Sequence, residues 1–197
     1  MTALASPPVL VTPSLPRQYT DEELAKLADD GVSEFVDGRV VEKDMNADAT
    51  WTAARVGHYI TISVIQAGAG DVFAEQSFRC VPNDPRGFRR PDVSFVAAGR
   101  VPTPAPGGPL PFAPDLAVEV VSPNDNVEEL ETKLAEYRAA GVRLVWVVIP
   151  AVRTVRVFPL DGPDHAVRAG DTLSGGDVLP GFAVPVADLF RPAAARP

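Results

Sequence analysis

A run of apolar residues in the middle of the chain constrains the fold more than any other feature. Residues 116–121 are apolar and largely β-branched apart from Glu119, which is typical of a central strand buried on both faces. Residues 122–126 cap a predicted helix over 127–140, and a second apolar run follows at 143–149. A strand, a helix and a strand in this order predict a right-handed crossover between two parallel strands.

The flanking sequence adds elements on both sides of this unit. Thr20 and Glu23 form a predicted capping box that opens a short helix ending near Asp29. Further elements are expected as a hairpin over 34–42, a helix over 48–66 and strands over 72–81, 92–96 and 154–158. Residues 171–190 are expected to supply short strands that close an edge of the sheet. The predicted fold is therefore α/β (α+β): a central mixed sheet flanked by helices, with an extra N-terminal hairpin and C-terminal strands.

The length and composition are those of a single globular domain. With 197 residues the chain can bury a real core, and we predict one domain over 19–190 between a flexible arm over 1–18 and a tail over 191–197. No apolar run approaches the roughly 20 residues of a membrane span, and the first residues lack the features of a secretory signal. We therefore expect a cytoplasmic protein without a membrane partner.

Scarce cysteine and histidine limit the kind of metal site that the chain can build. Cys80 is the only cysteine, and His58 and His165 are the only histidines. Any bound metal would be held by oxygen, which favours magnesium, manganese or calcium. The net charge of −8 suits broad binding of a phosphate backbone poorly, although local basic patches remain compatible with it.

Two acidic residues mark two strands of the predicted sheet. Asp92 begins one strand directly after Pro91, and Glu119 lies inside the central apolar run. Because side chains alternate along a strand, the two carboxylates can converge on one cation if the strands are neighbours. For Asp92 the alternative is an ordinary turn residue at a strand start. Glu119 has fewer structural explanations, since a carboxylate buried among valines is costly to desolvate.

Several other charged residues are candidates for the same site. Lys133 borders the apolar stripe of the predicted helix over 127–140, so its stem can carry the ammonium towards Glu119. Its spacing supports an ordinary surface ion pair with Glu129 equally well. Glu34 is a candidate extra acid, although hairpin glutamates are more often solvated. Candidate phosphate contacts are Arg86, Arg89 and Arg90.

Three stretches of the sequence, over 90–96, 114–123 and 133–142, resemble the Uma-type restriction endonuclease family. That family is a branch of the PD-(D/E)xK nuclease superfamily, and the likeness covers nearly all of residues 20–190. The resemblance implies a restriction-endonuclease-like core with a mixed sheet of about four strands between helices.

The resemblance also assigns roles to individual residues. It places Asp92 in the first motif and Glu119 in the second, and it makes the main-chain carbonyl of Val120 a metal ligand. The superfamily lysine would stand at position 121, where this chain has valine. The family carries a lysine relocated to the following helix, which matches Lys133.

Our leading hypothesis is Mg²⁺-dependent (or Mn²⁺-dependent) endonucleolytic hydrolysis of phosphodiester bonds in DNA. Asp92 and Glu119 would bind the cation, Lys133 would stabilise the developing charge and Glu34 would complete the acidic cluster. The main alternative is a nuclease fold that acts as a binding or accessory module without catalysis, which the acidic charge and the missing strand lysine favour. A third is hydrolysis of a small phosphate ester. A strand edge or apolar patch could support a homodimer, but no feature demands one.

Overall fold

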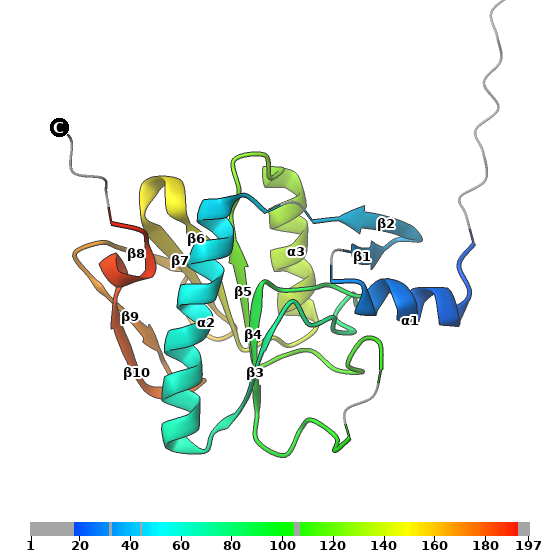
Figure 1. The fold of residues 1–197 in the computed structure, drawn as a ribbon, viewed down its shortest axis with the longest axis horizontal. Coiled ribbons are helices and arrows are strands. Elements are labelled where there is room, and N and C mark those ends of the chain that lie inside the picture. The colour runs from blue at the N-terminus through cyan, green and yellow to red at the C-terminus, as the bar shows by residue number, and fades with distance from the viewer. Residues whose placement is uncertain (1–17, 32, 44, 105–106, 193–197) are drawn as a thin grey trace, which may run out of the picture.

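The two central apolar runs lie side by side at the centre of the molecule (Figure 1). The computed structural model describes residues 18–31, 33–43, 45–104 and 107–192. Strands β5 (Leu116–Val120) and β6 (Leu144–Ile149) pair in parallel and are joined by helix α3 (Val127–Ala139). The predicted crossover is therefore confirmed. The predicted arm and tail lie outside the described residues, except for their innermost members.

Six strands of the described chain form one mixed sheet, in the order β3-β4-β5-β6-β7-β8. Besides β5 and β6, the sheet contains β3 (Gly70–Ala74), β4 (Val93–Ala97), β7 (Thr154–Pro159) and β8 (His165–Arg168). Every pairing except that of β5 with β6 is antiparallel. The mixed sheet is as predicted, and it has six strands where a core of about four was expected.

Helices cover both faces of this sheet (Figure 1). The long helix α2 (Ala47–Ala67) ends as predicted at Gly68, whose φ of 58° is left-handed. Its buried side chains join Val118 and Val120 in one apolar cluster, whereas Ala117 belongs to a second cluster with residues of α3. Successive residues of β5 thus point alternately towards α2 and α3, which is why every residue of the strand except Glu119 is apolar.

The N-terminal elements stand beside α3 at one side of the sheet (Figure 1). Helix α1 (Asp21–Asp29) begins with the predicted capping box. Strands β1 (Ser33–Val36) and β2 (Arg39–Glu42) form the predicted hairpin, with positive φ at both turn residues. That backbone is the two-residue turn that favours an Asp-Gly pair.

The strand predicted over 72–81 is wrong in its second half. Strand β3 ends at Ala74, and Glu75 adopts a left-handed backbone with φ of 52° that turns the chain away from the sheet. Beyond it, Phe78 makes only isolated bridges, to Arg89 and Leu110. Alternating hydrophobicity in this stretch reflects burial beneath a loop and not a continuous strand.

The C-terminal segment also differs from the expectation that it closes the sheet's edge. Strands β9 (Thr172–Gly175) and β10 (Leu179–Pro185) form a separate two-stranded sheet in the described chain. Phe182 packs against the buried Trp146 with ring centroids 5.3 Å apart, so the segment covers the core. Short 3₁₀ helices occupy Pro150–Val152 and Val186–Leu189. None of the described helices is long and apolar enough to cross a membrane.

Candidate functional site

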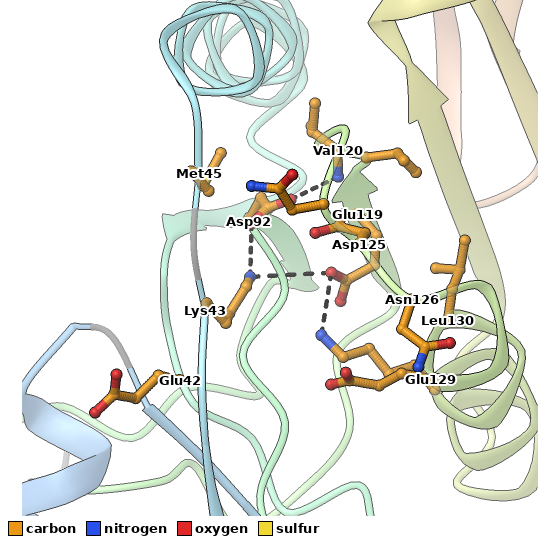
Figure 2. Close-up of a pocket in the computed structure, with 13 residues that line it drawn as sticks. Glu42, Lys43, Met45, Asp92, Glu119, Val120, Asp125, Asn126, Glu129 and Leu130 are labelled. Carbon is orange, nitrogen blue, oxygen red and sulfur yellow. Dashed lines mark hydrogen bonds and ion pairs between the residues drawn. The ribbon is translucent and has the colours of Figure 1, made fainter.

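Adjacent strands bring Asp92 and Glu119 to one place. Strands β4 and β5 are antiparallel neighbours in which Ser94 faces Ala117. Asp92 lies two residues before Ser94 and Glu119 two residues after Ala117, so alternation keeps both acids on one side of the sheet. Both carboxylates lie within ion-pair distance of a single ammonium group, that of Lys43 (Figure 2). The convergence expected from the strand pattern is present.

Asp92 is held by a donor on each of its carboxylate oxygens. Its Oδ1 lies 2.6 Å from the Nζ of Lys43, and its Oδ2 accepts a 2.5 Å hydrogen bond from the main-chain N–H of Val120. The same ammonium donates to the main-chain oxygen of Arg90 at 2.6 Å. Asp92 is only 3% exposed. These contacts fix its carboxylate against the end of β5.

Glu119 is equally enclosed. Its Oε1 accepts a 2.6 Å hydrogen bond from the hydroxyl of Tyr137, and its Oε2 lies 3.9 Å from Lys43 Nζ and 3.7 Å from Lys133 Nζ. Burial raises the pKa of Glu119, while the ammonium groups of Lys133 and Lys43 act in the opposite direction. The charged form of this carboxylate therefore depends on cations beside it.

Lys133 turns from α3 into the protein. Its ammonium lies 3.1 Å from Oε1 of Glu34 and 3.7 Å from Oε2 of Glu119. Among the described residues these are its ion-pair partners, so the alternative of a surface pair with Glu129 does not hold. Burial opposes the charged form of Lys133, but Glu119 and Glu34 together raise its pKa. The side chain is thus a buried, fixed positive charge next to Glu119.

Glu34 lies behind this pair and is completely buried. Its Oε2 contacts Nη1 of Arg89 at 2.8 Å, and its Oε1 accepts the main-chain N–H of Arg90 at 3.0 Å. Although burial works against ionisation, the charges of Lys133 and Arg89 lower the pKa of Glu34 to about 2. The structure places Glu34 as an anchor for Lys133, linking the hairpin to α3.

Two of the arginines expected at phosphate have internal partners instead. Arg89 is 2% exposed and also contacts Oε2 of Glu136 at 2.6 Å. Arg90 is 1% exposed and donates to several main-chain carbonyls, including that of Glu75 at 3.1 Å. Phosphate cannot reach guanidinium groups so deeply buried, so we correct the prediction for Arg89 and Arg90 to a structural role. Arg86 is about half exposed but pairs with Asp21 of α1, away from the residues that line the site cavity.

Three residues of the site were not predicted from the sequence: Lys43, Glu75 and Tyr137. Lys43 directly follows β2, and its position in the sequence does not show that its ammonium reaches Asp92. Tyr137 lies on α3, and spacing likewise does not show where its hydroxyl finds an acceptor.

Glu75 adds a third carboxylate to the surroundings of Lys43. Its Oε2 lies 3.7 Å from the Lys43 ammonium, and its side chain is about one third exposed. Burial raises the pKa of Glu75 to about 7, and the charges of Asp92 and Glu119 add to this against the opposing charge of Lys43. No sequence pattern indicated this residue, since its position follows from the turn that ends β3.

A cavity of about 190 Å³ opens beside these residues (Figure 2). It is lined by Glu42, Lys43, Met45, Asp92, Glu119, Val120, Val121, Asn124, Asp125, Asn126, Glu129, Leu130 and Lys133. Within the described part of the chain, no three His, Cys, Asp or Glu side chains are arranged to hold a metal. The carboxylate oxygens of Asp92 and Glu119 lie together at this cavity, within ion-pair distance of one ammonium group. Such oxygen donors fit Mg²⁺ or Mn²⁺ in kind.

A family model and a solved structure are similar to this chain. The Uma2 family model, described as "Putative restriction endonuclease", matches residues 21–187. The crystal structure of a putative nuclease belonging to DUF820 from Anabaena variabilis ATCC 29413 shares the fold, with a TM-score of 0.73 and 19% sequence identity. That match covers 88% of this chain and 98% of the other. Comparison with curated proteins found no match.

Proposed function

This chain belongs to the Uma2 family of putative restriction endonucleases, and from that premise we propose that it is a metal-dependent endonuclease hydrolysing phosphodiester bonds of DNA. One observation carries the proposal: Asp92 and Glu119, from neighbouring strands, converge on a single cationic group at the edge of an open cavity. Two carboxylates so placed repel each other unless a positive charge lies between them. A DNA substrate also fits the cytoplasmic location expected from the sequence.

Asp92, Glu119 and the main-chain carbonyl of Val120 would hold Mg²⁺ or Mn²⁺. A bound cation of this kind supplies Lewis-acid stabilisation of charge on phosphate and lowers the pKa of a water. The protein orients its ligands in advance. The N–H of Val120 fixes one oxygen of Asp92, and the hydroxyl of Tyr137 fixes one oxygen of Glu119.

Lys133 would provide the positive charge that the superfamily takes from its strand lysine. Its ammonium stands 3.7 Å from Glu119 and lines the cavity in which phosphate would bind. A cation fixed before the reaction stabilises charge that develops on phosphate oxygens. Oε1 of Glu34 lies 3.1 Å from the Lys133 ammonium and holds it in place, so we assign Glu34 a positioning role.

Cleavage of supercoiled plasmid and of single-stranded DNA with Mg²⁺ or Mn²⁺ tests the proposal. We expect the natural protein to nick DNA and Asp92→Asn to lose at least ~100-fold in rate, as enzymes do when a group stabilising transition-state charge is removed. Asp71→Asn, at an exposed carboxylate of β3, is the matched control and should cut normally. Equal cutting by Asp92→Asn would refute the assignment. A parallel screen of small phosphate esters separates a nuclease from a general phosphoesterase.

A second candidate function, a DNA-binding or accessory module without catalysis, is favoured by one observation. The ammonium groups of Lys43 and Lys133 already pair with Asp92 and Glu119, so both acids have cationic partners without any metal. This alternative predicts DNA binding without cleavage and no change in melting temperature when Mn²⁺ is added.

A further inference from the structure

The ammonium of Lys43 has the surroundings of a bound cation. Four oxygens of the described residues lie near it: Asp92 Oδ1 and the Arg90 carbonyl at 2.6 Å, Glu75 Oε2 at 3.7 Å and Glu119 Oε2 at 3.9 Å. The side chain is only 11% exposed. Figure 2 shows it reaching between the two acids from the chain segment that follows β2.

Each carboxylate oxygen of Asp92 already has a donor. Val120 N–H holds its Oδ2, and Lys43 holds its Oδ1. A divalent ion binds a carboxylate oxygen at about 2.0–2.6 Å, the range in which the ammonium already stands. Two positive charges that close together repel strongly in a partly buried site. We therefore expect the Lys43 ammonium and a metal ion to compete for Oδ1 of Asp92.

We propose that Lys43 is an autoinhibitory internal cation, whose ammonium closes the Asp92–Glu119 pair and has to leave Asp92 before a divalent cation binds. The inference rests on the proposed function, since it describes regulation of the same site.

Glu75 gives the displaced ammonium a second position. Its carboxylate already lies 3.7 Å from Lys43 and is more exposed than that of Asp92. Its left-handed backbone is held from both sides, because its N–H donates to the Asp92 carbonyl at 3.2 Å and its own carbonyl accepts from Arg90 at 3.1 Å. The flexible stem of Lys43 can swing the ammonium from one carboxylate to the other. Asp92 and Glu75 then compete for the Lys43 ammonium, and a metal ion binds when the ammonium pairs with Glu75.

Calorimetric titration of the full chain with Mn²⁺ tests this competition. We expect Lys43→Met to bind Mn²⁺ at least ~10-fold more tightly than the natural protein, because Oδ1 of Asp92 becomes free. Lys133→Met is the matched control. Lys133→Met removes an ammonium that is about as near Glu119 but does not contact Asp92. Its affinity for Mn²⁺ should therefore increase by less than ~3-fold. Lys43→Gln, which keeps a polar head without the charge, provides a second variant if the methionine impairs folding.

Glu75→Gln separates displacement from a simple change in charge. In the natural background it should weaken Mn²⁺ binding, since the displaced ammonium loses its second position. In the Lys43→Met background that coupling disappears, so the effect of Glu75→Gln should be smaller there. Melting in the presence of a chelator gives an independent readout. Lys43→Met should melt lower than the natural protein and regain stability when Mn²⁺ is added.

The outcomes distinguish the inference from the function on which it rests. Equal Mn²⁺ affinity in the natural protein and Lys43→Met, with binding lost in Asp92→Asn, would overturn the autoinhibitory role and keep the metal centre. Unchanged Mn²⁺ binding by Asp92→Asn would overturn the metal centre and the inference together.

Discussion

The hydroxyl of Tyr137 on α3 donates a 2.6 Å hydrogen bond to Oε1 of Glu119 on β5. Both side chains are buried, so this bond ties the crossover helix to the acid at the centre of the site. Burial raises the pKa of Tyr137 and the negative charge of Glu119 raises it further, so the tyrosine remains a donor. The same strand–helix–strand unit that defines the fold therefore also orients a proposed ligand.

Replacing that hydroxyl should cost stability. Tyr137→Phe leaves a buried carboxylate oxygen without its donor, and we expect a loss of ~1–3 kcal/mol in the free energy of unfolding measured with urea in chelator. Tyr59→Phe is the control, since the Tyr59 hydroxyl accepts from Arg55 at a half-buried position, and it should change stability by less than ~0.5 kcal/mol. Equal losses in both variants would argue against the role of this bond.

The two arginine variants should differ sharply in stability. Arg89→Met removes a buried guanidinium that contacts Glu34 and Glu136 and breaks both buried ion pairs, so we expect a loss of ~3–5 kcal/mol in the free energy of unfolding. Arg86→Met removes an exposed pair with Asp21 and should cost less than ~1 kcal/mol. Urea unfolding measures both. If Arg89→Met instead kept full stability and lost only DNA affinity, the original phosphate-contact prediction would be restored.

Much of the fold could be predicted because its signals are local. The apolar run of β5, the capping box of α1 and the Asp-Gly turn of the hairpin each specify backbone geometry within a few residues. Strand alternation likewise placed Asp92 and Glu119 on one face. The end of β3 could not be predicted in this way, because the left-handed backbone of Glu75 is held by contacts with Asp92 and Arg90, distant in sequence.

The charge pairs of the site were harder to predict for a related reason. Lys43 reaches Asp92 across 49 positions of sequence, and Arg89 reaches Glu34 across 55. Sequence spacing predicts neighbours within one helix or strand, but partners on different elements depend on how the hairpin docks against the sheet. The arginines were therefore expected at the surface although they lie inside.

Lys133 should separate stability from catalysis. Lys133→Met removes one buried ion-pair partner from each of Glu34 and Glu119, and we expect it to lower the free energy of unfolding by ~2–4 kcal/mol and to slow DNA cleavage by ~100-fold. Adding Glu34→Gln removes one of these two buried negative charges, so the double variant should regain part of the stability without regaining cleavage. Parallel recovery of both properties would mean that Lys133 acts only through folding.

Glu75 should give stability a dependence on pH near neutrality. Its pKa of about 7 in the folded protein lies above the ordinary value of 4.5, so the folded state binds more protons between these values. The stability that protonation of Glu75 contributes is fully present below about pH 4.5 and is lost as the pH rises through about 7. As the pH rises across this range, the free energy of unfolding of Glu75→Gln should therefore increase by ~1–3 kcal/mol relative to that of the natural protein. Urea unfolding in chelator measures this difference. Parallel curves for the two proteins would contradict this.

The location of a bound metal ion tests the central claim most directly. Crystals of the full chain soaked in Mn²⁺ should show an anomalous difference peak that contacts the carboxylates of both Asp92 and Glu119, with the Lys43 ammonium moved away from Asp92. No peak at these residues, or Mn²⁺ bound only elsewhere while Lys43 still holds Asp92, would contradict a metal-dependent nuclease site built on this pair.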